Sequence, residues 1–159
     1  MRKPPSGSGI PAVGEGKRGE AGYLGYLLRQ AASAQRLRMD RALGGLGLTL
    51  PQFLVLTMAR AYPGASNADL ARLTQLTPQT LSVIVGNLLK AGWVERRAHA
   101  AHGRIQMIRP TPAGEALLEA CRHHTAPLEA GLASSFSDAE LALVRRWLVA
   151  AAQDPHMEG

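Results

Sequence analysis

Apolar residues recur at intervals of three and four along most of the chain, and this spacing predicts a mainly helical fold. Since an α-helix completes a turn in about 3.6 residues, such intervals place the apolar side chains on one face of a helix. Six segments show the pattern, over about residues 21–45, 50–61, 67–74, 78–90, 112–133 and 138–153. The apolar stripe of the first is Leu24, Leu27, Leu28, Ala31, Ala34 and Leu37, that of the fifth is Leu117, Cys121, His124, Leu128 and Leu132, and that of the last is Leu141, Val144, Leu148 and Ala151.

Five of these helices are preceded by residues that typically begin a helix. A Ser or Thr side chain at this position accepts a hydrogen bond from an unpaired backbone N–H of the first turn, and an acidic residue three positions later completes a capping box. Proline is tolerated in the first turn because its missing N–H is not needed there. The predicted caps are Thr49 before Pro51, Ser66 with Asp69, Thr77 before Pro78, Thr111 before Pro112, and Ser137 with Glu140.

The helical spacing is interrupted between the fourth and fifth helices by two β-rich runs, WVERR and RIQMIR. In the second run Ile105 and Met107 alternate with Arg104 and Gln106, and the turn-prone AHAAHG lies between the runs, so they predict a β-hairpin. Two short helices joined by three residues, followed at once by a hairpin, make a winged helix-turn-helix. The predicted fold is therefore mainly α, of the α+β winged-helix kind, with six helices and a two-stranded wing.

Composition supports one domain of this kind with short tails. The chain has 159 residues, and 46% of them are hydrophobic, which suffices for one core. Residues 1–20 are rich in Pro, Gly and Ser, which predicts a flexible, mildly basic arm. Residues 155–159 are predicted to form a frayed tail. Neither a signal peptide nor an apolar run of about 18 residues is found, so we expect a cytoplasmic protein with no membrane partner.

The charge distribution favours a polyanionic partner. The chain has 18 Lys and Arg against 12 Asp and Glu, a net charge of +6. Between Ser66 and Arg109 the basic residues Arg72, Lys90, Arg96, Arg97, Arg104 and Arg109 face only two acidic residues, Asp69 and Glu95. With Leu81, Val85 and Leu88 turned inward, the fourth helix exposes amide and hydroxyl groups that can contact base edges and phosphates. A solvated helix-hairpin unit without a ligand is the alternative on these residues alone.

The segments TPQTLSVIVGNLLKAGWVERR and RIQMIRPTPAG resemble the MarR (multiple antibiotic resistance regulator) family of bacterial transcription factors. The resemblance covers about Ala21 to Ala152. It implies a winged-helix homodimer whose DNA-binding lobe spans about residues 47–110 and whose dimerisation helices span about residues 21–45 and 111–153, within a domain of residues 21–154. The recognition helices would enter successive major grooves of an operator, and the wings would reach the flanking minor grooves.

The resemblance also implies which residues meet DNA. Six residues match the family's DNA-facing positions, and Arg104 matches the arginine of the wing. The six are Thr77, Gln79, Thr80, Ser82, Val83 and Asn87. Backbone phosphates would be contacted by Arg72, Lys90, Arg96 and Arg97. Where the family's wing usually reads D-x-R, this chain reads H-G-R, so His99 and His102 replace acidic residues and make the wing tip more positive.

A small-molecule pocket between the dimer helices and the DNA-binding lobe is a further implication of the resemblance. The family's usual effectors are phenolic or other aromatic acids, or their thioesters. Each candidate residue is also compatible with an ordinary place in the core or on the surface. The candidates are Tyr23, Tyr26, Gln30, Phe53, Met58 and Tyr62.

The sequence thus predicts a ligand-responsive transcriptional repressor that binds a DNA operator as a homodimer. A metal-responsive regulator is an alternative, but His99 and His102 supply only two ligands. A redox-responsive regulator is another, although Cys121 lies in an apolar stripe that favours a structural thiol. A winged-helix module for protein contacts remains open. No motif of a hydrolase, a metalloprotease or a nucleotide-binding enzyme occurs, so neither catalysis nor a cofactor or bound metal is predicted.

Overall fold

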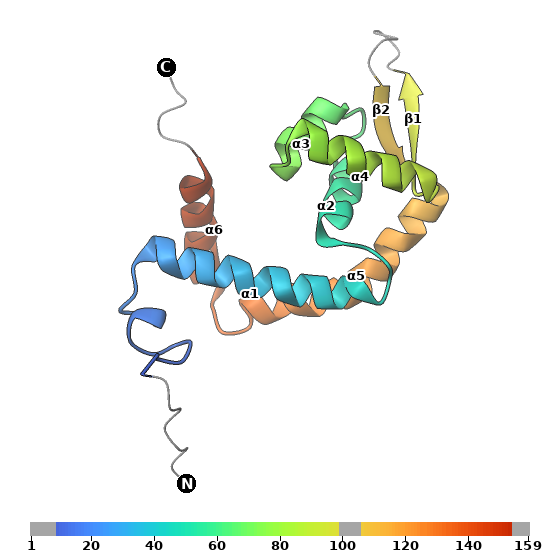
Figure 1. The fold of residues 1–159 in the computed structure, drawn as a ribbon. Helices are drawn as coiled ribbons and strands as arrows, with labels where there is room; N and C mark the ends of the chain where they lie inside the picture. The colour runs from blue at the N-terminus through green and yellow to red at the C-terminus, as the bar shows by residue number, and fades with distance from the viewer. Residues whose placement is uncertain (1–8, 99–105, 154–159) are drawn as a thin grey trace, which may run out of the picture.

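The computed structural model describes residues 9–98 and 106–153. Figure 1 shows α1 and α5 running side by side as a long base, with α2, α3, α4 and the two strands forming a lobe at one end and α6 rising from the other. The elements are η1 (Gly16–Arg18), α1 (Leu24–Gly44), α2 (Leu50–Ala61), α3 (Asn67–Thr74), α4 (Pro78–Lys90), β1 (Val94–Ala98), β2 (Gln106–Pro110), α5 (Pro112–Ala133) and α6 (Asp138–Ala152). The mainly helical fold predicted from the sequence is confirmed.

The predicted helix starts are confirmed at all five positions. In each case the Ser or Thr oxygen accepts a hydrogen bond from the backbone N–H three residues later, over distances of 3.1 to 3.4 Å. The helix α2 also has a capping box, which was not predicted. There the Gln52 side chain accepts a hydrogen bond from the Thr49 N–H at 3.0 Å. These bonds satisfy backbone donors that have no partner within the helix, so they determine where each helix begins.

The two strands form the base of the predicted wing. They pair antiparallel, with Val94 opposite Pro110 and Arg96 opposite Ile108. A hydrogen bond of 3.1 Å from the Ile108 N–H to the Ala65 carbonyl ties β2 to the turn before α3. The wing is therefore fixed at its base to the turn that precedes α3. Of the predicted turn AHAAHG, residues 98–103, Ala98 ends β1, while residues 99–103 lie outside the described residues, as do Arg104 and Ile105 of the second predicted run.

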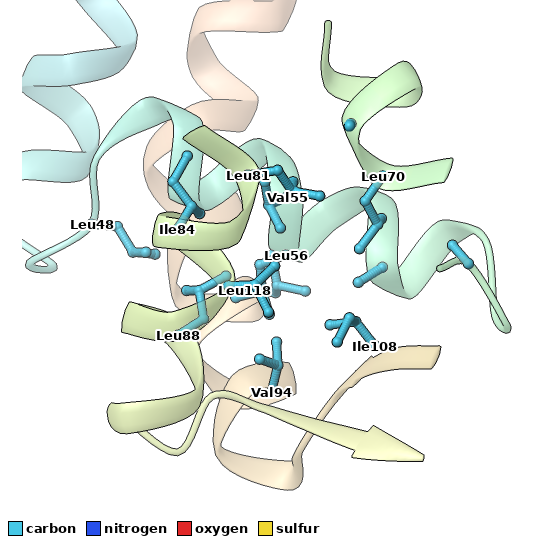
Figure 2. Packing of buried hydrophobic residues seen from close by; sticks show 14 of the residues in the cluster. Leu48, Val55, Leu56, Leu70, Leu81, Ile84, Leu88, Val94, Ile108 and Leu118 are labelled. Atoms are coloured by element: carbon cyan, nitrogen blue, oxygen red, sulfur yellow. The ribbon is translucent and has the colours of Figure 1, made fainter. Parts of the chain in front are cut away.

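The hydrophobic core lies in the winged lobe. Figure 2 shows side chains of α2, α3, α4, both strands and the first turns of α5 meeting there. The largest fully buried side chains are Leu43, Leu56, Leu70, Leu81, Leu88, Ile108, Val55, Val85 and Cys121. Burial of this apolar surface is what holds α4 and the wing in one orientation.

The apolar stripe predicted for α5 is only partly correct. Leu118, which the stripe omitted, is buried, whereas His124 is exposed and Leu132 is 47% exposed. The reason is that only the first turns of α5 pack against the winged lobe, and the later turns run along α1.

The helices outside the winged lobe expose much apolar surface. None of the residues of α6, Asp138–Ala152, is buried, and α1 buries only Leu43. The large exposed apolar side chains of these regions include Leu24, Leu37, Leu132, Phe136, Leu143, Val144, Trp147, Leu148 and Val149. Within the described residues, no helix has both the length and the hydropathy to cross a bilayer.

The segment before α1 contacts that helix through Arg18. Residues 1–20 are predicted to form a flexible, basic arm, and their described part, from residue 9 on, includes the short helix η1. Arg18 and Gln30 exchange two hydrogen bonds of 3.2 Å, one between side chains and one from the Gln30 amide to the Arg18 carbonyl. The Arg18 guanidinium also donates to the Pro11 carbonyl at 3.0 Å. Residues 1–8 and the predicted frayed tail, residues 155–159, lie outside the described residues.

Candidate nucleic-acid interface

A tight turn sets the angle between α3 and α4. Gln75 adopts the left-handed conformation, with φ of 56°, and its N–H donates to the carbonyls at the end of α3. The Leu76 N–H donates to the Ala71 carbonyl at 3.0 Å, and the Leu76 side chain packs against the core. The chain therefore reverses within the three residues that the sequence predicts as the turn, and Thr77 begins α4.

The helix α4 has one buried face and one exposed face. Leu81, Ile84, Val85 and Leu88 are buried in the core of the lobe (Figure 2). The predicted base-contacting residues all lie exposed on the rest of the helix, and Val83 is 64% exposed. They are Gln79, Thr80, Ser82, Val83 and Asn87. An exposed aliphatic side chain among amides and hydroxyls suits a surface that reads base edges and thymine methyl groups.

The first turn of α4 carries its own polar network. The Thr77 hydroxyl donates to the Thr80 hydroxyl at 2.9 Å and accepts from the Thr80 N–H at 3.2 Å. Both side chains are exposed, so the network lies at the surface where the helix begins. Because a helix N-terminus carries partial positive charge, this turn is suited to hold a phosphate oxygen.

The four predicted phosphate contacts are all exposed, and two of them are held by acidic neighbours. Arg72 pairs with Asp69, and Arg97 pairs with Glu95 at 2.9 Å. Hydrogen bonds from Ser66, together with the Arg72 guanidinium, lower the pKa of the Asp69 carboxyl. Ion pairs as exposed as these contribute little to stability, so either arginine can exchange its carboxylate for a phosphate. The other two contacts, Lys90 and Arg96, are likewise exposed.

The end of α4 is joined directly to the start of α5, through a contact that was not predicted. The Thr111 hydroxyl donates to the Gly92 carbonyl at 2.6 Å, and the Thr111 N–H donates to the Trp93 carbonyl at 3.1 Å. A Cβ atom on Gly114 would lie 2.0 Å from the Trp93 carbonyl oxygen. The TPAG motif indicated a helix cap at Thr111, but its contact with a turn 19 residues earlier could not be predicted from local spacing. Through this contact the start of α5 is held against the turn that ends α4.

The predicted effector residues are dispersed in the single chain. Tyr23 is 79% exposed, while the Tyr26 hydroxyl donates to Gln30 at 3.4 Å. Phe53 and Met58 are half-buried against the core. The last candidate, Tyr62, caps the end of α2 and lines a hollow together with Arg72 and Leu73 of α3.

Redox sensing and metal sensing were the two alternative chemistries, through Cys121 and through the wing-tip histidines. Cys121 is fully buried, and burial raises the pKa of its thiol, so the reactive thiolate is disfavoured. Within residues 9–98 and 106–153, no three His, Cys, Asp or Glu side chains gather as metal ligands. The wing-tip residues His99, His102 and Arg104 lie outside the described residues.

Comparison with known proteins identifies relatives of the same architecture. A family model described as the MarR family matches residues 46–105. The HTH-type transcriptional repressor Rv2887 of Mycobacterium tuberculosis is 42% identical over 94 residues, which are 59% of this chain and 68% of the relative.

Solved structures show the same fold over most of the chain. The crystal structure of Rv2887 in complex with p-aminosalicylic acid superposes with a TM-score of 0.64 at 30% identity, covering 82% of this chain and 99% of that one. The structure of the MepR–DNA complex from S. aureus superposes with a TM-score of 0.73 at 25% identity, covering 81% and 96%. The lower identity to Rv2887 in the superposition reflects its longer alignment, since the sequence match spans only 94 residues.

Proposed function

The chain belongs to the MarR family of transcriptional regulators, and from this premise we propose that it is a homodimeric repressor released from its operator by a small aromatic acid. The operator would be pseudopalindromic, with half-sites about one helical turn apart, because the two recognition helices of a twofold dimer enter successive major grooves. The observation that carries the proposal is the exposed polar face of α4, fixed by a buried opposite face and followed by a basic wing.

The DNA contacts divide into two kinds on this helix and its neighbours. Gln79, Thr80 and Asn87 offer amide and hydroxyl groups for base edges, and Val83 a methyl contact. Arg72, Lys90, Arg96 and Arg97 surround them and would supply the salt-dependent affinity for the backbone. In the proposal Arg104, with His99 and His102, reaches the minor groove from the wing tip.

The exposed apolar helices support the homodimer. A helix such as α6, which buries none of its residues within one chain, needs a partner to cover its apolar face. The helices α1 and α5 form a base with the winged lobe at one end and α6 at the other (Figure 1). A second chain can therefore cover α1, α5 and α6 without touching α4. We propose residues 21–45 and 111–153 as the dimerisation helices and residues 47–110 as the DNA-binding lobe.

The effector proposal rests on the relative. Crystal structures of Rv2887 contain p-aminosalicylic acid and salicylic acid, which are aromatic carboxylates. In a dimer, the second chain would approach α1 and could bring Tyr23, Tyr26 and Gln30 into a ligand pocket with Phe53, Met58 and Tyr62. Regulation of transcription calls for no catalysis, so the proposed protein is not an enzyme, and its place of action is the DNA of the cytoplasm.

The test is fluorescence anisotropy of the full chain with the DNA immediately upstream of its own gene, beside a scrambled duplex, at two salt concentrations. A specific regulator should bind the upstream duplex at least about a hundredfold more tightly than the scrambled one. Salicylate should then release the bound duplex. Equal, weak and steeply salt-dependent binding to both duplexes would overturn the repressor and favour a module for protein contacts.

Two substitutions separate base reading from phosphate binding. Gln79→Ala should weaken binding to the upstream duplex and leave the scrambled duplex unaffected, since only a base-edge contact is lost. Arg96→Gln should weaken binding to both duplexes and lower the salt slope by about one unit. If the two variants behave alike, the division of roles along α4 and the wing is wrong.

A further inference from the structure

We propose that a hollow on the outer side of the wing base is a binding site for a small organic carboxylate. The hollow has a volume of about 460 Å³ and lies between the end of α2, the turn before α3, the two strands and the first turn of α5. Ligand sites for small molecules fall in this range of volumes. It is separate from the exposed face of α4, since it is lined by neither α4 nor α3.

The positive charge around the hollow exceeds its negative charge. The guanidinium groups of Arg97 and Arg109 both approach the same oxygen, Oε1 of Glu95, at 2.9 and 3.5 Å. Arg60 pairs with Glu115 at 3.7 Å across the hollow's other side. Three arginines thus surround two carboxylates, and two arginine forks share one carboxylate oxygen. A second carboxylate could form with them the paired N–H···O bonds that a guanidinium fork favours.

The remaining lining distinguishes an organic anion from an inorganic one. Pro63, Gly64 and Pro110 present apolar surface, and the half-buried Met107 of β2 lines the same hollow. The Met107 sulfur lies 3.5 Å from the position that a Cβ on Gly64 would occupy, so the glycine leaves that surface open beside a polarisable thioether. A flat apolar body can rest on such a surface while its carboxylate meets the arginines.

The pairing of the strands keeps this site apart from the core-facing side of the wing. Arg96 and Ile108 are partners in the register and share one face, whereas Arg97 is paired with Met107 and Glu95 with Arg109 on the other. The ion pairs around the hollow are exposed, with 60% of the Arg97 side chain and 62% of the Arg109 side chain accessible. Because exposed ion pairs contribute little stability, an incoming carboxylate can replace Glu95 as the partner of these arginines at a small cost in free energy.

Ligand binding at this hollow would change the affinity for DNA, because Arg97 takes part in both. If the proposed function holds, a ligand that binds Arg97 removes one phosphate contact and so lowers the affinity for the operator. Bound DNA then lowers the affinity for the ligand by the same factor. The site itself does not depend on DNA and can be tested without it.

The first test is an NMR titration of the DNA-free full chain with benzoate, following backbone amides and methionine methyl groups. The expected result is a saturable shift at Gly64 and the Met107 methyl. Benzamide, which keeps the ring and loses the charge, should bind at least about tenfold more weakly, as expected for loss of charged hydrogen bonds. Inorganic phosphate should also bind more weakly than benzoate. Equal binding of phosphate, equal binding of benzamide, or no saturable shift at these two groups would each overturn the proposal.

Substitutions at the rim should change the affinity in opposite directions. Arg109→Gln should weaken benzoate about tenfold or more, whereas Glu95→Gln should strengthen it, because both arginines then lose their internal carboxylate. Arg146→Gln on α6 removes the same charge far from the hollow and should leave the affinity unchanged. If Glu95→Gln weakens benzoate, or if Arg146→Gln changes it as much as Arg109→Gln does, the arginine pair is not the site. If the wild-type chain binds its operator specifically but does not bind benzoate, the carboxylate site is refuted and the proposed repressor function is not.

Discussion

Gly114 shows how one residue constrains the whole DNA-binding surface. It is buried in the first turn of α5, and a Cβ there would lie 2.0 Å from the backbone oxygen of Trp93 and 3.0 Å from its carbonyl carbon. Since the obstacle is backbone, it can yield only if α5 moves away from the end of α4. The hydrogen bonds from Thr111 to Gly92 and Trp93 oppose that movement. Only glycine fits at this position.

We therefore expect Gly114→Ala to lower the free energy of unfolding by about 1–3 kcal/mol, the usual cost of overpacking. The gain in helix propensity from glycine to alanine, about 0.5–1 kcal/mol, is smaller and does not offset it. Urea unfolding followed by circular dichroism would measure the change.

Gly86→Ala is the matched control. Gly86 lies within α4 in the same lobe, and an added Cβ would have no atom within 4 Å. This variant should gain stability from the helix propensity alone. If the two alanine variants shift the unfolding midpoint in the same direction, the contact between α5 and the end of α4 is not as close as described.

At the level of elements, the helix starts were the most predictable part of the fold. A cap depends on residues at most three positions apart, so Ser66 with Asp69 and Ser137 with Glu140 could be identified from spacing alone. The contact between the short helix η1 and α1 could not, because it joins Arg18 to Gln30, 12 residues along the chain.

The capping box of α3 should make stability depend on pH. Ser66 and Arg72 lower the pKa of Asp69 in the folded state, so the unfolded state binds the proton more readily. The stabilisation is therefore complete above the unfolded pKa, near 3.8, and is lost as pH falls through the lower folded pKa. Asp69→Ala should consequently be less stable than the wild type at neutral pH, and the difference should shrink in acid. Urea unfolding between about pH 7 and pH 3 measures it.

The box of α2 is the control, because Gln52 fills the position of Asp69 and does not titrate. Gln52→Ala should lower stability by the same amount across the pH range. A difference for Asp69→Ala that stays constant down to the lowest pH would show that the carboxylate is not what the box depends on.

At the level of the whole molecule, the sequence identified apolar stripes but not what covers them. Leu81 of α4 and Leu118 of α5 are buried within the chain. Val144 and Leu148 also lie on an apolar face with helical spacing, on α6, but they are exposed. Spacing determines which side chains share a face, but a face covered by its own chain and one covered by a second chain have the same pattern. The exposed positions of α4 were predictable because the inward face of that helix is covered by its own lobe. The hollow beside the wing was not, since it joins α2, both strands and α5.

The exposed face of α6 makes dimerisation testable by one added charge. Trp147 is 38% exposed and lies at helical spacing from Leu143 and Val144 on this face. If a second chain covers it, Trp147→Glu buries an unpaired carboxylate in the interface and should yield monomers, since such burial costs several kcal/mol. Ala142→Glu adds the same carboxylate on the opposite face of α6 and should remain dimeric.

Light scattering after size exclusion would give the oligomeric state of both variants, and circular dichroism would check that their helices persist. The monomeric variant should also lose operator affinity, because one winged lobe engages one half-site where the dimer engages two. The core of the winged lobe includes no residue of α6, so its fold should survive the substitution. If Trp147→Glu remains a dimer while Ala142→Glu dissociates, the opposite face of α6 forms the interface. If both remain dimers with full operator affinity, α6 lies outside the interface, and the exposed side chains of α1 and α5 must carry it alone.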